Sequence, residues 1–231
     1  MTPAFCRTTP IITALVLSVV SASAQTRPQP RPAQTPAVPP PPPPAFSVRL
    51  FADGGLNTFA AGRSFNAVFG EDSGPVYGGG GEVVLRGRWF VRVDLWRFHD
   101  EGERAVRLEN QTFRLGIPLT VTIMPVEVGA GLRLPLGRRR TLIPYVGGGV
   151  SSHSYKETSS FSTGEEDVNE RFTGYQILGG LEFRLHRIVG IAGEIQYTTV
   201  PDAIGAGGLS AEFNETDLGG VIVRARVLFG R

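Results

Sequence analysis

The chain has 231 residues, 41% of them hydrophobic, a formal net charge of +2 and one cysteine. Its pI near 9.0 overstates the basic character, because Arg7, Arg27 and Arg31 lie in an N-terminal region without acidic residues. Removing these three from the 23 basic residues leaves 20 against 21 acidic ones. No basic patch stands out, so a nucleic-acid partner is not expected. The single Cys6 excludes a disulfide framework and a thiolate metal site.

Residues 1–24 are predicted to be a secretory signal peptide. Arg7 gives a weakly positive start, Ile11–Val20 is a short apolar run, and Ala22-Ser23-Ala24 is a small-residue cleavage site. The run is shorter than the roughly 20 apolar residues that a membrane-spanning helix needs, which disfavours an uncleaved anchor. Cleavage would also remove Cys6.

Residues 25–45 are predicted to be a linker, because they are rich in proline and end in the run Pro39–Pro44. Such a segment does not pack a core and favours an extended polyproline II conformation. We expect it to act as a semi-rigid periplasmic spacer. A ligand for a proline-binding module is the alternative.

From Phe46 onward, apolar and polar residues alternate in short segments, which predicts strands with one apolar and one polar face. The last segment is the clearest, since Val221–Phe229 has aliphatic residues at odd positions and Arg224 and Arg226 at even ones. The predicted strands are Phe46–Gly55, Val76–Arg86, Trp89–Phe98, Leu119–Leu134, Leu142–Tyr155, Arg171–Leu185, Ile188–Thr199 and Asp217–Arg231.

The connections alternate between long and short. The long ones are 56–75, 99–118, 156–170 and 200–216, and the short ones lie around Gly87, 135–140 and 186–187. Within the second long connection, Ala105–Ile117 alternates well enough to predict a hairpin that extends above the barrel. Pro125 is expected to mark a bulge or an edge-like break, because proline cannot donate to the ladder.

An even number of alternating strands with short turns at one end and long loops at the other is typical of an outer-membrane barrel. The predicted fold is therefore all-β, an eight-stranded antiparallel up-and-down transmembrane β-barrel over residues 46–231, with both termini on the periplasmic side. Outward aromatic residues would form two girdles at the membrane surfaces. Those at the loop ends are Tyr77, Tyr175 and Tyr197, and those at the turn ends are Trp89, Tyr145, Phe183 and Phe229.

The polar faces of the strands carry charges of both signs. An eight-stranded barrel is just wide enough for side chains to fill it, and a lone buried charge is costly, so these groups should pair across the interior. The prediction is a plugged polar lumen with at most narrow water pockets. The inward charges would be Arg49, Asp53, Glu82, Arg86, Arg92, Asp94, Glu127, Arg133, Glu182, Arg184, Glu194, Arg224 and Arg226.

Residues 46–231 resemble the small outer-membrane β-barrel family, the group like outer-membrane proteins A and X. The resemblance rests on the preceding signal segment, the alternating strands, the segment Ile143–Val150 and a last strand that ends near Phe229. The resemblance implies an eight-stranded barrel, and it is weak for function. One departure is the ending Phe229-Gly230-Arg231, where such families usually end in an aromatic residue.

Glycine runs at 78–81, 147–149 and 205–208 resemble phosphate cradles, but no helical pattern follows the first. We expect these glycines to pack beside aromatic side chains in the barrel wall.

Ser152, His153, Ser154 and Glu157 are the candidate catalytic residues, at the outer end of a strand. Serine, histidine and a carboxylate could form a nucleophilic site facing lipid, as in the lipid A deacylases, whose architecture is similar. Neighbouring strand residues point to opposite faces, so His153 should face away from Ser152 and Ser154. That geometry disfavours catalysis.

Glu165, Glu166, Asp167 and Glu170 are the candidate metal ligands. They could hold calcium or magnesium, but they lack the spacing of a cation-binding loop, so a solvated acidic loop is the simpler interpretation.

The expected protein is thus a non-enzymatic outer-membrane barrel of a Gram-negative bacterium, without cofactor, acting structurally or through four external loops. Its expected partners are outer-membrane lipid and the barrel-assembly machinery, and the sequence does not identify a loop partner. Two alternatives stay open: a lipid-modifying barrel enzyme, and a soluble periplasmic barrel with aliphatic residues inside that binds an apolar ligand.

Overall fold

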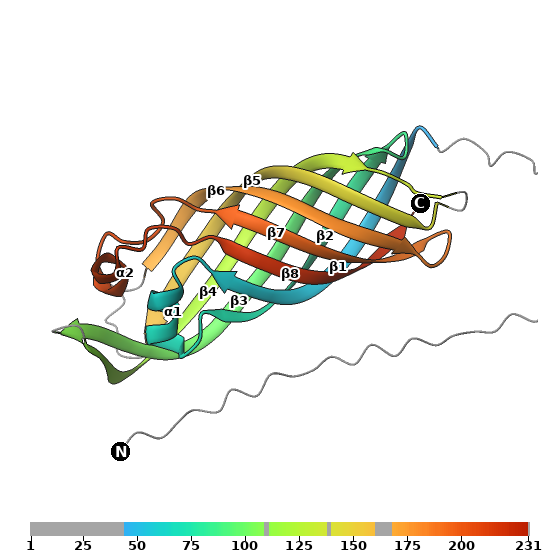
Figure 1. The fold of residues 1–231 in the computed structure, drawn as a ribbon. Coiled ribbons are helices and arrows are strands. Elements are labelled where there is room, and N and C mark those ends of the chain that lie inside the picture. The colour runs from blue at the N-terminus through green and yellow to red at the C-terminus, as the bar shows by residue number, and fades with distance from the viewer. Residues whose placement is uncertain (1–43, 109–110, 138–139, 160–167, 231) are drawn as a thin grey trace, which may run out of the picture. The chain divides into compact units, whose positions relative to one another are not determined.

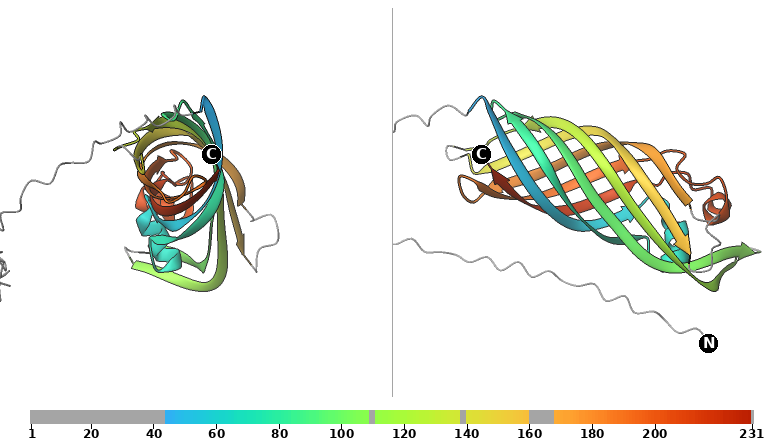
Figure 2. Two further views of the ribbon diagram at one scale, coloured as in Figure 1. Left: turned by 90° about the vertical axis from the view of Figure 1, so that its right-hand side faces the viewer. Right: turned by 180° about the vertical axis from the view of Figure 1, so that it is seen from behind.

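A computed structural model describes residues 44–108, 111–137, 140–159 and 168–230, in which eight antiparallel strands close into one barrel (Figure 1). Each strand pairs with the next along the chain, and β1 pairs with β8 to close the ring, which Figure 2 shows end-on. The predicted eight-stranded up-and-down architecture is confirmed. The strands are β1 (Phe46–Phe59), β2 (Ser73–Leu85), β3 (Trp89–Leu108), β4 (Gln111–Arg133), β5 (Leu142–Ser159), β6 (Val168–Arg184), β7 (Val189–Thr199) and β8 (Gly220–Gly230).

Polar residues of the strands face inward and apolar residues face outward. In β8, Arg224 is 3% exposed, whereas its neighbour Val223 is 55% exposed. The alternation follows from the two-residue period of a strand. This orientation contradicts the soluble alternative, which required aliphatic residues inside and charges outside.

The two ends of the barrel differ. Short turns join β2 to β3, β4 to β5 and β6 to β7 at what we call the turn end. Longer connections carry α1 (Gly62–Phe69) and α2 (Gly208–Phe213) at the opposite, loop end (Figure 1). No helix among the described residues is long and apolar enough to cross a membrane.

Most strands extend further toward the loop end than predicted. The expected hairpin is confirmed, but it is a direct continuation of β3 and β4, with a register shift between Glu103 and Ala105. At Pro125 the β3–β4 pairing is interrupted and then resumes in the same register, while the pairing with β5 continues. Proline therefore opens a local break in the ladder without a bulge.

The two helices were not predicted, and both lie in segments that the sequence analysis treated as loops. In α1, Phe65, Val68 and Phe69 have the three- and four-residue spacing of a helix face, but the helix spans only eight residues. Such a short helix is not stable by itself, so its formation depends on packing against the barrel.

The barrel interior is mixed rather than uniformly polar, which corrects the predicted polar lumen. Phe51, Ala192 and Leu228 form one buried apolar cluster, and Val84, Phe90 and Leu178 form another. Tyr145 packs against both, so it lies inside and not in the outer aromatic girdle. Arg86 and Arg184 are exposed at the turn end rather than buried in the lumen.

Glycines of the first two runs make room for inward aromatic rings, as expected, whereas the run at 205–208 lies in the β7–β8 connection and not in the barrel wall. A Cβ on Gly80 would come within 2.8 Å of the Phe51 ring, and one on Gly147 within 3.0 Å of the Phe90 ring. Both approaches are too close for a normal carbon contact.

Candidate functional site

The loop end of the barrel is closed by an aromatic cluster that seats α1. Phe65 of α1 stacks on Phe59 at the end of β1, with ring centroids 3.8 Å apart, and Phe98 of β3 meets Phe59 edge-on at 4.8 Å. Phe69, one turn further along α1, packs against Phe65 and Phe98. Aromatic stacking and burial thus fix the helix on the barrel rim.

A carboxylate from a distant loop caps the first turn of α1. The first N–H groups of a helix lack partners within it, and Ala61 at the N-cap position offers no side-chain acceptor. Glu215 supplies the acceptors, receiving hydrogen bonds from the backbone N–H of Arg63 at 3.1 Å and of Ser64 at 2.9 Å. The Ser64 hydroxyl donates to the same carboxylate at 2.6 Å.

The protonation of Glu215 reflects these contacts. Burial alone would raise the pKa of its carboxyl, but the hydrogen bonds from Ser64 and Arg63 outweigh burial and lower the pKa from its ordinary value. A negative charge here also interacts favourably with the helix dipole.

Phe213, at the end of α2, is held between two guanidinium groups. Arg63 of α1 lies 5.3 Å from the ring centroid and Arg107 of the β3–β4 hairpin lies 4.9 Å from it, both within cation–π range. Arg107 also donates to the backbone oxygen of Glu212 at 3.2 Å. Three connections that are far apart in sequence therefore meet at one aromatic ring.

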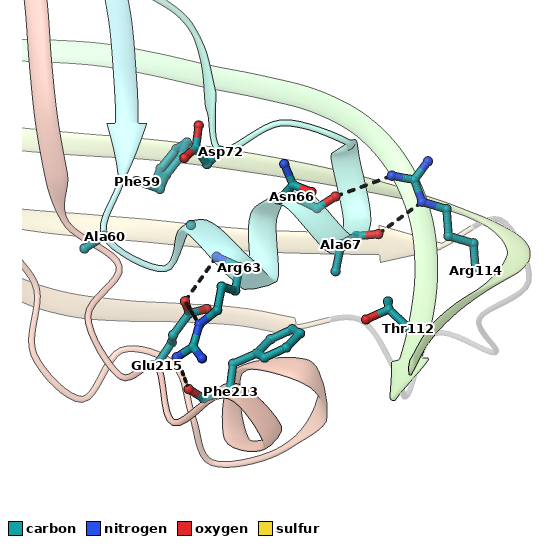
Figure 3. Close-up of a pocket in the computed structure, with 11 residues that line it drawn as sticks. Phe59, Ala60, Arg63, Asn66, Ala67, Asp72, Thr112, Arg114, Phe213 and Glu215 are labelled. Carbon is teal, nitrogen blue, oxygen red and sulfur yellow. Dashed lines mark hydrogen bonds and ion pairs between the residues drawn. The ribbon is translucent and has the colours of Figure 1, made fainter. Parts of the chain in front are cut away.

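Arg114 of β4 holds the other end of α1 by donating to the backbone oxygen of Ala67 at 3.2 Å. Between α1, the hairpin and α2 lies an open cleft of about 850 Å³, which we call the loop-end cleft (Figure 3). Its polar lining comprises Arg63, Asn66, Asp72, Thr112, Arg114 and Glu215. The cleft offers donors, acceptors and the apolar Phe213 ring to a polar ligand.

Below the loop end, the barrel interior contains two groups of ion pairs. The turn-side ion cluster joins Arg49, Glu82, Arg133 and Glu182. Arg49 donates to Glu82 at 2.6 Å and to Glu182 at 2.8 Å, and Arg133 donates to the second oxygen of Glu182. Two arginines thus face two carboxylates, as the expected pairing across the lumen requires.

The central ion cluster lies at mid-height. Arg92 donates one hydrogen bond to each carboxylate oxygen of Glu194, at 2.5 and 3.0 Å. A guanidinium nitrogen of Arg224 lies 3.2 Å from a carboxylate oxygen of Asp94. Glu127 is held by neutral donors, Trp96 at 2.8 Å and Gln196 at 2.9 Å. The cluster consists of Asp53, Arg92, Asp94, Glu127, Glu194, Arg224 and Arg226.

The candidate catalytic residues do not form a site together. His153 is buried in the lumen, whereas Ser152 is exposed on the outer face, as strand parity predicted. The histidine instead contacts Ser151, with 2.9 Å between Nε2 and the hydroxyl oxygen. Glu157 accepts a hydrogen bond from Tyr155 rather than from the histidine. Ser151 was not among the predicted residues, although its two-residue spacing from His153 places both side chains on the same face of the strand.

Of the candidate metal ligands, Glu165, Glu166 and Asp167 lie outside the described residues. Glu170 is an exposed residue of β6, opposite Tyr155 of β5. Within the described ranges, no group of three or more histidine, cysteine, aspartate or glutamate side chains is arranged to hold a metal ion.

The model of a family described as "Outer membrane protein beta-barrel domain" matches residues 12–219, which is most of the chain. The protein belongs to this outer-membrane β-barrel family. A comparison with curated protein sequences gives no match.

The chain is also similar to solved structures of other outer-membrane barrels. OprG from Pseudomonas aeruginosa has a TM-score of 0.52 and 12% identity over 80% of this chain and 95% of its own. The N-terminal barrel domain of OprF from the same organism has a TM-score of 0.46 and 16% identity, covering 80% and 97%. Neisserial surface protein A has a TM-score of 0.46 and 12% identity, also covering 80% and 97%. At such low identity these likenesses concern the fold alone.

Membership in the family places this barrel in the outer membrane of a Gram-negative bacterium and explains its outer surface. Ile191, Ile195 and Val223 are 44%, 60% and 55% exposed, and comparable aliphatic side chains surround the ring. In water such a band would promote aggregation, whereas in a bilayer it contacts acyl chains. The outward apolar faces are thus the lipid-facing surface.

Proposed function

We propose that this protein is a non-enzymatic barrel with a plugged lumen that acts at the cell surface through its four longer connections. The observation that carries the proposal is the fixed arrangement at the loop end. Glu215, Phe213 and Arg114 tie α1, α2 and the β3–β4 hairpin together around the loop-end cleft. A binding surface whose parts are already ordered loses little entropy when a ligand binds.

The ion pairs and the small cavities support a plugged lumen. The cavity beside the turn-side ion cluster and the one beside His153 each have a volume of about 10 Å³. A cavity of that size holds about one water molecule. Paired arginines and carboxylates with such narrow gaps are poorly suited to solute passage.

The burial of the hydrogen-bonded pair Ser151–His153 supports a non-enzymatic role. Ser151 and His153 are 4% and 2% exposed, so lipid outside the barrel does not reach them. Asp217 is an acidic residue at the loop end of the barrel. Its carboxylate accepts hydrogen bonds from the Thr199 hydroxyl and from the backbone N–H groups of Val200 and Gly219, rather than from His153.

Single-cysteine labelling in intact cells tests the proposed orientation. Mature protein without residues 1–24 contains no cysteine, so Thr112→Cys in the cleft and Arg187→Cys at the turn end each introduce one reporter. A membrane-impermeant maleimide should label the first in intact cells and the second only after permeabilisation. The opposite pattern would refute the proposal that the cleft faces outward.

Two further measurements address the lumen and catalysis. Liposomes that contain the refolded barrel should not swell in isotonic arabinose, and lipid A from expressing cells should keep the mass of lipid A from control cells. Swelling would contradict the plugged lumen, and a mass change that disappears with His153→Ala would restore the enzyme hypothesis.

Processing and partners remain part of the proposal. Residues 1–24 would be removed as a signal peptide, and residues 25–45 would form a periplasmic spacer before β1. Outer-membrane lipid would surround the apolar band, and the barrel-assembly machinery would insert the chain. Residues 1–43 lie outside the described part of the chain.

A further inference from the structure

The turn end of the barrel gathers basic residues from three separate turns. Sequence segments 86–88, 134–141 and 184–188 contain seven arginines and one histidine but no aspartate or glutamate. The barrel brings these segments to one end, because they follow the even-numbered strands β2, β4 and β6, which all run in the same direction. The described arginines of this group, which we call the basic collar, are Arg86, Arg88, Arg140, Arg184 and Arg187.

The turns that carry the collar are joined by their backbones. The backbone N–H of Arg133 donates to the oxygen of Arg88 at 2.6 Å, which links the first turn to the strand that leads into the second. The N–H of Arg184 donates to the oxygen of Thr141 at 2.8 Å, which links the second turn to the third. The arginines therefore lie along a continuous arc of the barrel rim.

The collar arginines are exposed, and none makes an ion pair with another described residue. They differ in this respect from Arg49 and Arg133, which are buried against carboxylates of the turn-side ion cluster. The described acidic residues of the connections lie at the other end, for example Asp202 and Glu212 in the β7–β8 connection. Among the described residues, the turn end thus presents a positive rim without acidic partners, which corrects the expectation that no basic patch stands out.

The position of the collar relative to the lipid-facing surface points to its occupant. Arg88 precedes Trp89, and Arg184 follows Phe183, both of which are outward aromatic residues at the turn end, 56% and 45% exposed. Aromatic side chains of this kind sit at the level of lipid headgroups. Arg88 and Arg184 are exposed and adjacent to these aromatic residues in the chain, so their long side chains lie within reach of the phosphate layer.

We infer that the basic collar binds the phosphate groups of anionic phospholipids in the leaflet at the turn end of the barrel. Guanidinium groups pair with phosphate oxygens through two parallel hydrogen bonds, which makes arginine well suited to this ligand. The assignment of that leaflet to the periplasmic side rests on the proposed orientation. Lipid binding itself rests only on the collar and the adjacent apolar band.

Trp89 provides a local probe for this inference. It lies on the outer face beside Arg88, whereas the other tryptophan, Trp96, is buried inside the barrel against Glu127. Phosphatidylglycerol and phosphatidylcholine with brominated acyl chains should therefore quench mainly Trp89 in reconstituted vesicles. We expect the relative binding constant to favour phosphatidylglycerol about threefold at low salt, because each basic residue near a headgroup attracts anionic lipid.

The test variant is Arg88→Gln/Arg184→Gln/Arg187→Gln, which leaves out Arg86 and Arg140 because both have positive φ angles. The matched control is Lys156→Gln/Arg171→Gln, which removes two exposed basic residues from the strands near the loop end. The lipid preference should fall to near one in the test variant and persist in the control. A preference that survives in the test variant, or that disappears only in the control, would overturn the inference.

Wild-type protein gives a second measurement if the triple variant does not refold. Raising the salt to 0.5 M shortens the screening length to about 4 Å, so the preference for phosphatidylglycerol should decline toward one. Equal quenching by the two lipids at low salt would refute the collar as a lipid site. A third outcome combines two results: the wild type shows no lipid preference, and soluble polyphosphate binds the wild type but not the test variant. It would identify a soluble polyanion as the ligand of the collar and overturn the inference.

The two proposals fail in distinguishable ways. Vesicles carry anionic lipid in both leaflets, so the quenching experiment does not depend on which way the barrel faces in cells. Reversed maleimide labelling with a normal lipid preference would reject the proposed orientation alone. Normal labelling without a preference would reject the collar alone.

Discussion

Glu182 is the carboxylate at which two arginines of the lumen meet, since Arg49 donates to both of its oxygens and Arg133 donates to one of them. With 1% exposure, it has no access to solvent that could replace these contacts. Glu182→Gln would leave the two guanidinium groups with a single negative partner, Glu82. Breaking a buried pair in this way costs about 3–5 kcal/mol, which urea titration of the refolded barrel would measure.

Two variants separate this effect from a general loss of charge. Glu170→Gln removes an exposed carboxylate from the same strand and should change the unfolding free energy by less than about 0.5 kcal/mol. Glu182→Gln/Arg133→Met removes both partners and should recover part of the loss. An equal loss in Glu170→Gln and Glu182→Gln would show that the turn-side ion cluster has no special role.

At the scale of an element, α1 depends on groups supplied by other parts of the chain. The helix has neither an N-cap side chain that accepts a hydrogen bond nor a basic residue in its last turn. Glu215 caps its first turn instead, and Arg114 donates to a carbonyl of its last turn. An eight-residue helix with such partners forms only when the loops that hold it are in place.

The cap makes the stability of α1 depend on pH. Because the pKa of Glu215 is lowered in the folded state, its contribution is fully present above the ordinary value of 4.5 and is lost as the pH falls through the lower folded pKa. Hydrogen exchange at the backbone N–H groups of Arg63 and Ser64, corrected for intrinsic rates, should accelerate in that acidic range.

Glu215→Gln should accelerate exchange at these two amides near neutral pH and abolish its dependence on acid. The matched control is Glu212→Gln, which removes a neighbouring exposed carboxylate on α2 and should preserve the wild-type profile. Unchanged protection in Glu215→Gln would contradict the assigned cap.

The whole molecule places its apolar surface outward, so the cost of a charge there should depend on depth in the membrane. Ile191 is an outward residue of β7, and Ile188 lies at the turn end just before that strand. Ile191→Arg should destabilise the barrel by about 2–4 kcal/mol if it lies near the midplane, whereas Ile188→Arg should cost about 0–1 kcal/mol near the interface.

Reversible unfolding in lipid vesicles measures both free energies, with heat-modifiable gel mobility as the check that each variant has folded. Equal costs at the two positions would contradict the membrane depth assigned to the outer surface. Normal folding of Ile191→Arg in water would contradict a membrane barrel altogether.

The strands were predictable from sequence because their signal is local. Alternation at Val223 and Arg224 already separates a lipid-facing side from an interior side, and the lengths of the connections indicate which ends carry loops. Where glycines blur the alternation, as around Gly147, the sequence did not fix the direction of Tyr145. Inward packing against Phe90 decides it, at a ring distance of 6.1 Å.

By itself, the sequence determined the eight-stranded barrel, its polar interior positions and the opposite orientations of Ser152 and His153, because each follows from the period of a strand. Only the tertiary structure decided the pairing of Arg49 with Glu182, the capping of α1 by Glu215 and the assembly of the basic collar. These depend on closure of the ring, which brings together residues separated by 133 and 151 positions and three turns from different parts of the chain. Local patterns carry no information about such distances, since every register that differs by an even number of residues is compatible with the same alternation.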